Sequence, residues 1–127
     1  TGGARRGQGG GGGREKVRRG PDLRGAMLVQ HDVTLNIHHS APEEIWRRVG
    51  GVYQSMPYWA GNARGPRWTG GEIDLWASVE PGGLQIAGAM PEEIWREWYG
   101  RLKAALTDAL GYEIGEVADG YDFIYWE

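Results

Sequence analysis

The chain has 127 residues, enough for one domain with a hydrophobic core of ordinary size. It contains no cysteine, which excludes disulfides, thiolate-bound metals and cysteine nucleophiles and suits a reducing compartment. The net charge of −3 is unevenly spread, because residues 1–26 carry seven basic and two acidic groups whereas residues 27–127 carry seven basic and fifteen acidic groups. No apolar run approaches the roughly 20 residues of a membrane-spanning helix, so we expect a cytoplasmic protein that does not enter a membrane.

Residues 1–26 differ in composition from the rest of the chain. They contain ten glycines, no aromatic residue, and only Val17 and Leu23 as large aliphatics. Such a segment buries too little apolar surface to offset its conformational entropy, so we predict a disordered Gly/Arg-rich tail. An Arg/Gly tail can bind nucleic-acid phosphates, but repeated Arg-Gly-Gly units and interleaved aromatics are missing, which favours a linker or sequence upstream of a start at Met27. Residues 27–127 are then a single acidic domain.

An internal repeat organises this domain. Residues 35–47 align without gaps on residues 84–96, and eight of the thirteen aligned positions are identical. Each copy reads as a short alternating strand followed by an amphipathic helix whose first turn is Pro-Glu-Glu, a favourable helix start. The repeat predicts that Trp46 and Trp95 occupy equivalent core positions. Gly111 is placed to cap the second helix.

Two further strands and a turn complete the predicted fold. Residues 73–79 alternate apolar and polar side chains, residues 81–83 read Pro-Gly-Gly and suit a tight turn, and residues 84–89 form the returning strand. Residues 121–126 are aromatic and alternating, which predicts a last strand. The order β-α-β-β-α-β with an internal repeat predicts an α+β fold, a ferredoxin-like two-layer sandwich.

The sequence contains no recognisable catalytic constellation. His38 and His39 are neighbours on a predicted strand, so their side chains point to opposite faces and do not suit one metal ion. The glycine tract lies in the tail rather than between a strand and a helix, so it does not match a phosphate-binding loop. We therefore predict a protein that is not an enzyme and that uses no cofactor and no metal.

The open face of the predicted sheet is one candidate binding surface. It is expected to present His38, Asp74, Trp76 and Gln85. Aromatic residues on an exposed sheet are how some RNA-binding modules stack bases, but the acidic domain repels phosphates, and nucleic acid is disfavoured. A small molecule or nucleotide on this face remains the alternative function.

The connection formed by residues 56–71 is the other candidate. It is long for a compact domain, and long loops are often functional. It contains residue types that dominate binding interfaces, namely Tyr58, Trp59, Arg64, Arg67 and Trp68, which we predict to contact a partner. The competing interpretation is a short extra strand or an aromatic staple packed on the core.

Residues 56–59 (Met-Pro-Tyr-Trp) and 78–85 carry a family resemblance. The stretch 33–123 resembles small, largely uncharacterised bacterial and phage-borne α+β proteins, and its size and acidity are similar to those of immunity proteins of polymorphic toxin systems. The resemblance implies a non-enzymatic inhibitor, either an immunity protein or a phage counter-defence factor, and supplies no catalytic residues. An acidic domain would be steered toward a basic partner protein such as a toxin.

Overall fold

The structure is a computed structural model that describes residues 27–124 and residue 126. The predicted tail, residues 1–26, lies outside the described residues. The elements are β1 (Leu28–Leu35), α1 (Glu43–Ser55), β2 (Trp59–Gly61), β3 (Arg67–Gly70), β4 (Ile73–Glu80), β5 (Gly83–Pro91), α2 (Glu92–Leu110) and a 3₁₀ turn, η1 (Val117–Asp119). Neither helix has the length and apolar character needed to cross a lipid bilayer.

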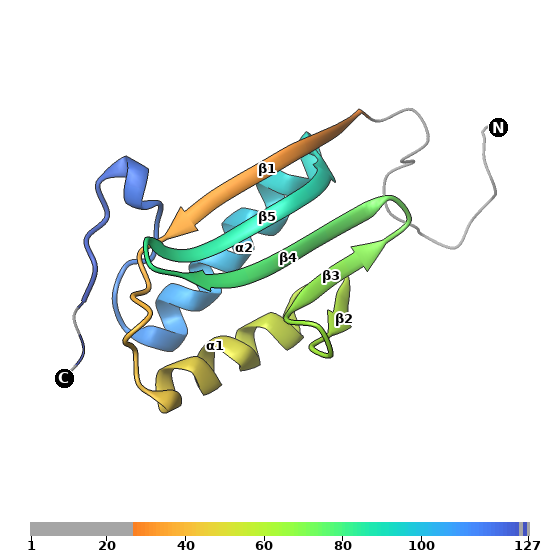
Figure 1. Ribbon diagram of the computed structural model, residues 1–127. Helices are drawn as coiled ribbons and strands as arrows, with labels where there is room; N and C mark the ends of the chain where they lie inside the picture. The colour runs from red at the N-terminus through yellow and green to blue at the C-terminus, as the bar shows by residue number, and fades with distance from the viewer. Residues whose placement is uncertain (1–26, 125, 127) are drawn as a thin grey trace, which may run out of the picture.

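The five strands form one sheet in the order β1-β5-β4-β3-β2, and every neighbouring pair is antiparallel. Both helices cover the same face, which leaves the other face open (Figure 1). The predicted α+β class is confirmed. The exact ferredoxin-like arrangement is not confirmed, because the strand order differs: β2 and β3 extend the sheet beyond β4, and no strand follows α2 in the described residues. Residues 56–71 contain two strands too short to stand out in the sequence, and the described residues after position 120 contain no strand.

The internal repeat does not produce two equivalent halves. Leu35 and Leu84, which begin the two copies, are paired with each other across β1 and β5. The first copy leaves the sheet at once and reaches α1 through irregular residues 36–42, whereas the second copy continues as β5 directly into α2. The same sequence pattern therefore sits in two different local structures.

The two helices also bury different members of the repeat. Ile45 is buried in α1 and its neighbour Trp46 is half-buried, whereas in α2 Trp95 is buried and Ile94 is half-buried. A one-residue change in the buried position corresponds to a rotation of about 100° about the helix axis. The core position of Trp95 is confirmed, and the equivalent position for Trp46 is wrong.

The core lies between the helices and the covered face of the sheet. Residues at helical spacing on α1 (Ile45, Val49, Tyr53) and on α2 point into it. Gly111 ends α2 in the left-handed conformation, as predicted, and its N–H donates to the carbonyl of Thr107 at 2.9 Å. α1 runs beside the β4 side of the sheet (Figure 1).

The end of β4 is not covered by the next strand. β3 pairs only with the first half of β4, from Gly70 opposite Ile73 to Arg67 opposite Trp76. Residues 77–80 of β4 continue beyond β3 while remaining paired to β5 on their other side. This overhang sets the geometry of the candidate site.

Candidate functional site: the free edge of strand β4

The predicted binding loop is a β2–β3 hairpin that packs on the core. Trp68 has 0% exposure, and its indole N–H donates to the carbonyl of Tyr53 at 3.1 Å. Its ring meets the rings of Tyr53 and Trp98 edge-on, with centroids 5.0 and 5.2 Å away. Trp68 offers no surface to a partner, and its position is that of the competing interpretation, an aromatic staple.

The other two aromatic residues of this segment lie beside Trp68. Trp59 is paired with Trp68 across β2 and β3 and is half-buried against the core. Tyr58 is 36% exposed and adopts a φ of 76°, which is unusual for a residue with a side chain. Its ring lies against Gly70, where an added Cβ would approach it to 3.0 Å. Tyr58 lines a separate small hollow beside α2.

The two predicted arginines lie together on the open face. Arg67 pairs with Asp74 at 2.5 Å, and its guanidinium lies 5.8 Å from the centroid of Trp76. Arg64 is exposed in the turn between β2 and β3 and forms no ion pair with any residue in the described part of the chain. Both arginines line an open hollow of about 500 Å³, here called the arginine hollow. Its other walls are formed by Trp76, Ala77, Ser78, Glu80 and Gln85.

Three of the four residues predicted for the open sheet face are there. Asp74 and Trp76 alternate with buried residues along β4, and Gln85 donates to the carboxylate of Asp32 on β1 at 2.9 Å. His38 is not on the sheet, so its predicted position is wrong. β1 ends at Leu35, and the His38 ring lies in the following turn, with Nδ1 2.7 Å from the hydroxyl oxygen of Ser40.

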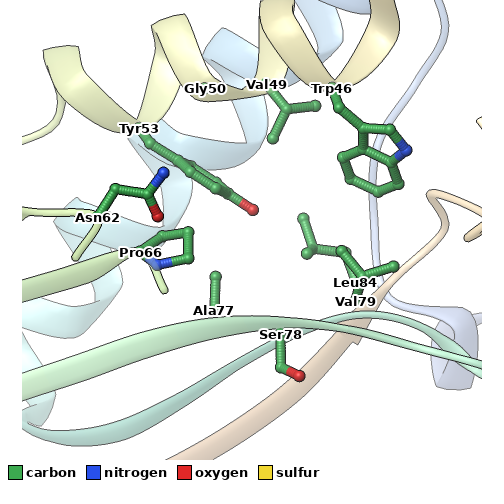
Figure 2. A pocket seen from close by; sticks show the side chains of 10 residues that line it. All are labelled: Trp46, Val49, Gly50, Tyr53, Asn62, Pro66, Ala77, Ser78, Val79 and Leu84. Atoms are coloured by element: carbon green, nitrogen blue, oxygen red, sulfur yellow. The ribbon is translucent and has the colours of Figure 1, made fainter. Parts of the chain in front are cut away.

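A second hollow, of about 310 Å³, lies on the helix side of the β4 overhang and is here called the apolar hollow. Figure 2 shows α1 above it and the sheet below it. Its walls are formed by Trp46, Val49, Gly50, Tyr53, Asn62, Pro66, Ala77, Ser78, Val79 and Leu84. The side chain of Val79 is 50% exposed at its edge. Gly50 lies on the helix side of this hollow, where an added Cβ would meet no atom within 4 Å.

The hydroxyl of Tyr53 points into the apolar hollow (Figure 2). Burial raises the pKa of Tyr53 well above its ordinary value of 10.0, so the group stays neutral. It has no hydrogen-bond partner among the residues that the structure describes. A neutral hydroxyl in an apolar wall can orient a ligand by one hydrogen bond.

The backbone between the two hollows has unused hydrogen-bonding groups. The N–H of Ala77 donates to the carbonyl of Pro66 at 3.1 Å. The reciprocal bond cannot form, because proline has no N–H. In an antiparallel sheet, the backbone N–H and C=O groups of every second residue point to the same side of the strand. The N–H and C=O of Val79, two residues after Ala77, therefore also point away from β5. No strand in the described part of the chain pairs with them.

Sequence reasoning missed this edge, although two signals were present. Gly50 and Gly51 interrupt an otherwise regular helix at a cost of roughly 1 kcal/mol each. Pro66 stands directly before a strand, where it ends pairing with the neighbour. Neither signal states which strands are neighbours, so the edge could not be located without the sheet order.

The two hollows and the β4 edge between them present groups that can bind a ligand. Among residues 27–124 and residue 126, no three His, Cys, Asp or Glu side chains gather as a metal site. The functional groups at the edge include two arginines, the carboxylate of Glu80, an indole, a neutral phenol and backbone amides. No protein-family model, curated protein or solved structure matches this chain.

Proposed function

We propose that the chain is a non-enzymatic protein-binding domain, an inhibitor of the immunity or counter-defence kind, that binds its partner along the edge of β4. The observation that carries the proposal is the overhang of residues 77–80 between two open hollows, whose outer edge pairs with no strand beyond the single hydrogen bond from Ala77 to Pro66. A free sheet edge beside exposed apolar surface is an adhesive feature that proteins normally cover or charge. A partner protein would cover it here.

Charge gives the second line of support. Residues 27–127 hold fifteen acidic and seven basic groups, and such a surface accelerates encounter with a basic partner. The long-range field sets the association rate, whereas the apolar and hydrogen-bonding groups at the edge hold the complex. The two contributions separate experimentally, because only the first is screened by salt.

Co-expression tests this function. The proteins encoded by the neighbouring genes are each produced alone and together with the full chain, and cell growth and complex formation are measured. Restored growth with a co-purifying complex is the expected result. Unrestored growth with no complex by size-exclusion chromatography would contradict the proposal. The association rate should fall as salt rises while the dissociation rate changes little.

The arginine hollow favours one alternative function, the binding of a small anionic molecule or nucleotide. Arg64 and Arg67 could hold phosphate oxygens while Trp76 stacks on a ring. Titration of the full chain with nucleotides, followed by thermal shift, distinguishes the two. A saturable rise in melting temperature that Arg64→Ala abolishes would favour the alternative.

A further inference from the structure

We propose that the partner binds by adding one extended segment to the sheet beside residues 77–80 of β4, and that this segment reads basic–apolar–acidic from its N-terminus. The inference rests on the proposed protein-binding function and specifies which part of the partner is recognised. The segment would occupy the position that β3 vacates at Pro66 and would run antiparallel to β4, as β3 does.

Backbone groups fix the register of the added segment. Val79 presents one N–H donor and one C=O acceptor to the free edge, and Ala77 presents a carbonyl that Pro66 cannot satisfy. An antiparallel residue placed opposite Val79 exchanges two hydrogen bonds with it. That residue is the centre of the recognised segment.

The residue opposite Val79 has its side chain in the apolar hollow. Directly opposed residues of an antiparallel pair point to the same face, and Val79 contributes to the wall on the helix side. Val49, Leu84 and the half-buried Trp46 complete an apolar wall there. A large aliphatic or aromatic side chain is the matching occupant, since it removes this surface from water.

The two flanking side chains of the segment point to the open face, because side chains alternate along a strand. The following residue lies opposite Ser78, on the side of Arg64 and Arg67, which favours an acidic side chain. The preceding residue lies opposite Glu80, which favours a basic one. The hydroxyl of Ser78 already donates to Glu80 and helps to hold this carboxylate in place.

The outer edge of β1 is less suited to such pairing. Its C-terminal end is already engaged, because Leu35 is bridged to Glu116 and the N–H of Asn36 donates to Gly115. Asp32 places an exposed carboxylate along the rest of this edge, a feature that discourages strand addition. The outer edge of β1 therefore provides a matched control.

The test uses NMR titration of the isotope-labelled full chain with synthetic heptapeptides up to millimolar concentration. The probe carries Lys-Leu-Glu at its centre, and the comparison peptides carry Glu-Leu-Lys and Lys-Asn-Glu. We expect the first peptide to shift the amide signals of Val79, Gly50 and Arg64 and to bind about tenfold or more tightly than the others, the usual effect of one lost charge-assisted contact or one lost apolar anchor.

Two pairs of variants locate the site. Gly50→Leu fills the apolar hollow and should abolish binding, whereas Gly51→Leu gains similar helix propensity on the exposed side and should bind normally. Val79→Pro removes the N–H that β4 presents to its free edge. Gln30→Pro is the matching variant on β1, because the N–H of Gln30 points away from β5, as the N–H of Asn36 does. Only Val79→Pro should weaken the complex.

Arg64→Glu supplies a test whose expected result cannot arise from loss of folding. It should reverse the preference at the acidic position, so that a peptide with Lys-Leu-Lys binds better than Lys-Leu-Glu. Circular dichroism and melting temperature verify that each variant is folded.

Several outcomes would overturn the inference. Absence of shifts at Val79, equal binding of the three peptides, or normal binding by Gly50→Leu would each exclude an added segment of this kind. Binding of a peptide of residues 1–26 at the same place, lost in Gly50→Leu, would assign the edge to the chain's own tail. Dimerisation that Gly50→Leu abolishes would assign it to a second copy. A growth-restoring complex that survives Gly50→Leu would overturn the inference and leave the proposed function standing.

Discussion

Asn36 and Gly115 lie 79 positions apart and exchange two hydrogen bonds. The N–H of Asn36 donates to the carbonyl of Gly115 at 3.1 Å, and the N–H of Gly115 donates to the side-chain oxygen of Asn36 at 2.9 Å. The Asn36 amide nitrogen also donates to the carbonyls of Glu113 and Asp122. One buried side chain thereby ties the end of β1 to the C-terminal segment.

Replacing Asn36 by Ala should lower the free energy of unfolding by roughly 2–4 kcal/mol, because it leaves several buried backbone groups without partners. Urea denaturation followed by tryptophan fluorescence measures the loss. Gln85→Ala, which removes an exposed hydrogen bond on the open face, is the control and should change stability by less than about 0.5 kcal/mol. Equal losses for both variants would contradict the anchoring role of Asn36.

The two repeat tryptophans should differ in their contribution to stability. Trp95 is buried and stacks on His31 with ring centroids 4.1 Å apart, whereas Trp46 is only half-buried beside the apolar hollow. Trp95→Ala should cost about 3–5 kcal/mol, and Trp46→Ala less than half of that. Matching losses in parallel urea titrations would restore the idea of equivalent halves.

Residues 1–26 should be dispensable for folding, given their high glycine content and lack of aromatic residues. A chain that begins at Met27 should melt within about 5 °C of the full chain, a difference equivalent to roughly 1 kcal/mol for a domain of this size. Differential scanning calorimetry provides the comparison. A larger drop would show that the tail contributes to the folded domain.

Stability should fall steeply in alkali because of two buried tyrosines. Burial raises the pKa of Tyr53, and burial together with the hydrogen bond to Glu116 raises that of Tyr99. The unfolded chain loses these protons near pH 10 while the folded chain keeps them, so this stabilisation is complete below about pH 10 and lost above it. Each tyrosine should add a slope of about −1.4 kcal/mol per pH unit above pH 10.

Urea midpoints between pH 8 and pH 11, a range chosen around the ordinary tyrosine pKa of about 10, measure that slope. Tyr99→Phe removes one titrating group and should flatten the alkaline branch while keeping the ring in place. An unchanged slope in Tyr99→Phe would mean that another group controls the alkaline unfolding.

The β2–β3 hairpin should separate stability from binding. Trp59→Ala removes a ring packed on Trp68 and should destabilise the fold by about 2–4 kcal/mol. Arg64→Ala removes an exposed side chain and should leave unfolding unchanged while weakening the partner complex by about 1–2 kcal/mol. Calorimetric titration and urea denaturation of both variants give the two quantities. A loss of stability in Arg64→Ala would indicate that Arg64 supports the fold, and would contradict its assignment to the binding surface.

Much of the fold was predictable where the hydrophobic pattern of a segment matches the neighbours that it meets in the folded chain. The helical spacing of α2 and its cap at Gly111, and the alternating strands β4 and β5 around their Pro-Gly turn, matched the structure. Residues 121–126 show the same alternation, yet their described members lie outside the sheet, beside the buried Asn36. Alternation indicates a strand only if a neighbour is available for pairing, and pairing depends on residues far away in the chain.

The candidate site was less predictable for the same reason. Trp68 and Arg67 are adjacent in sequence, but one is buried in the core and the other lies on the open face, because successive residues of a strand point in opposite directions. The amino-acid composition singled out residues 56–71, but it could not show which of their side chains face the core and which face the open side of the sheet. The β4 edge arises from the length of β3, which Pro66 limits.

The sheet order has a consequence for synthesis of the chain. β2, β3, β4 and β5 pair with their neighbours in sequence, whereas β1, made first, pairs with β5. Leu28 lies opposite Pro91, so β1 has no partner until more than half of the chain has left the ribosome, an interval of several seconds at ~5–20 residues per second. During that interval its apolar side chains Val29, Val33 and Leu35 are exposed. A chaperone that binds extended apolar segments would find its target in β1 during translation.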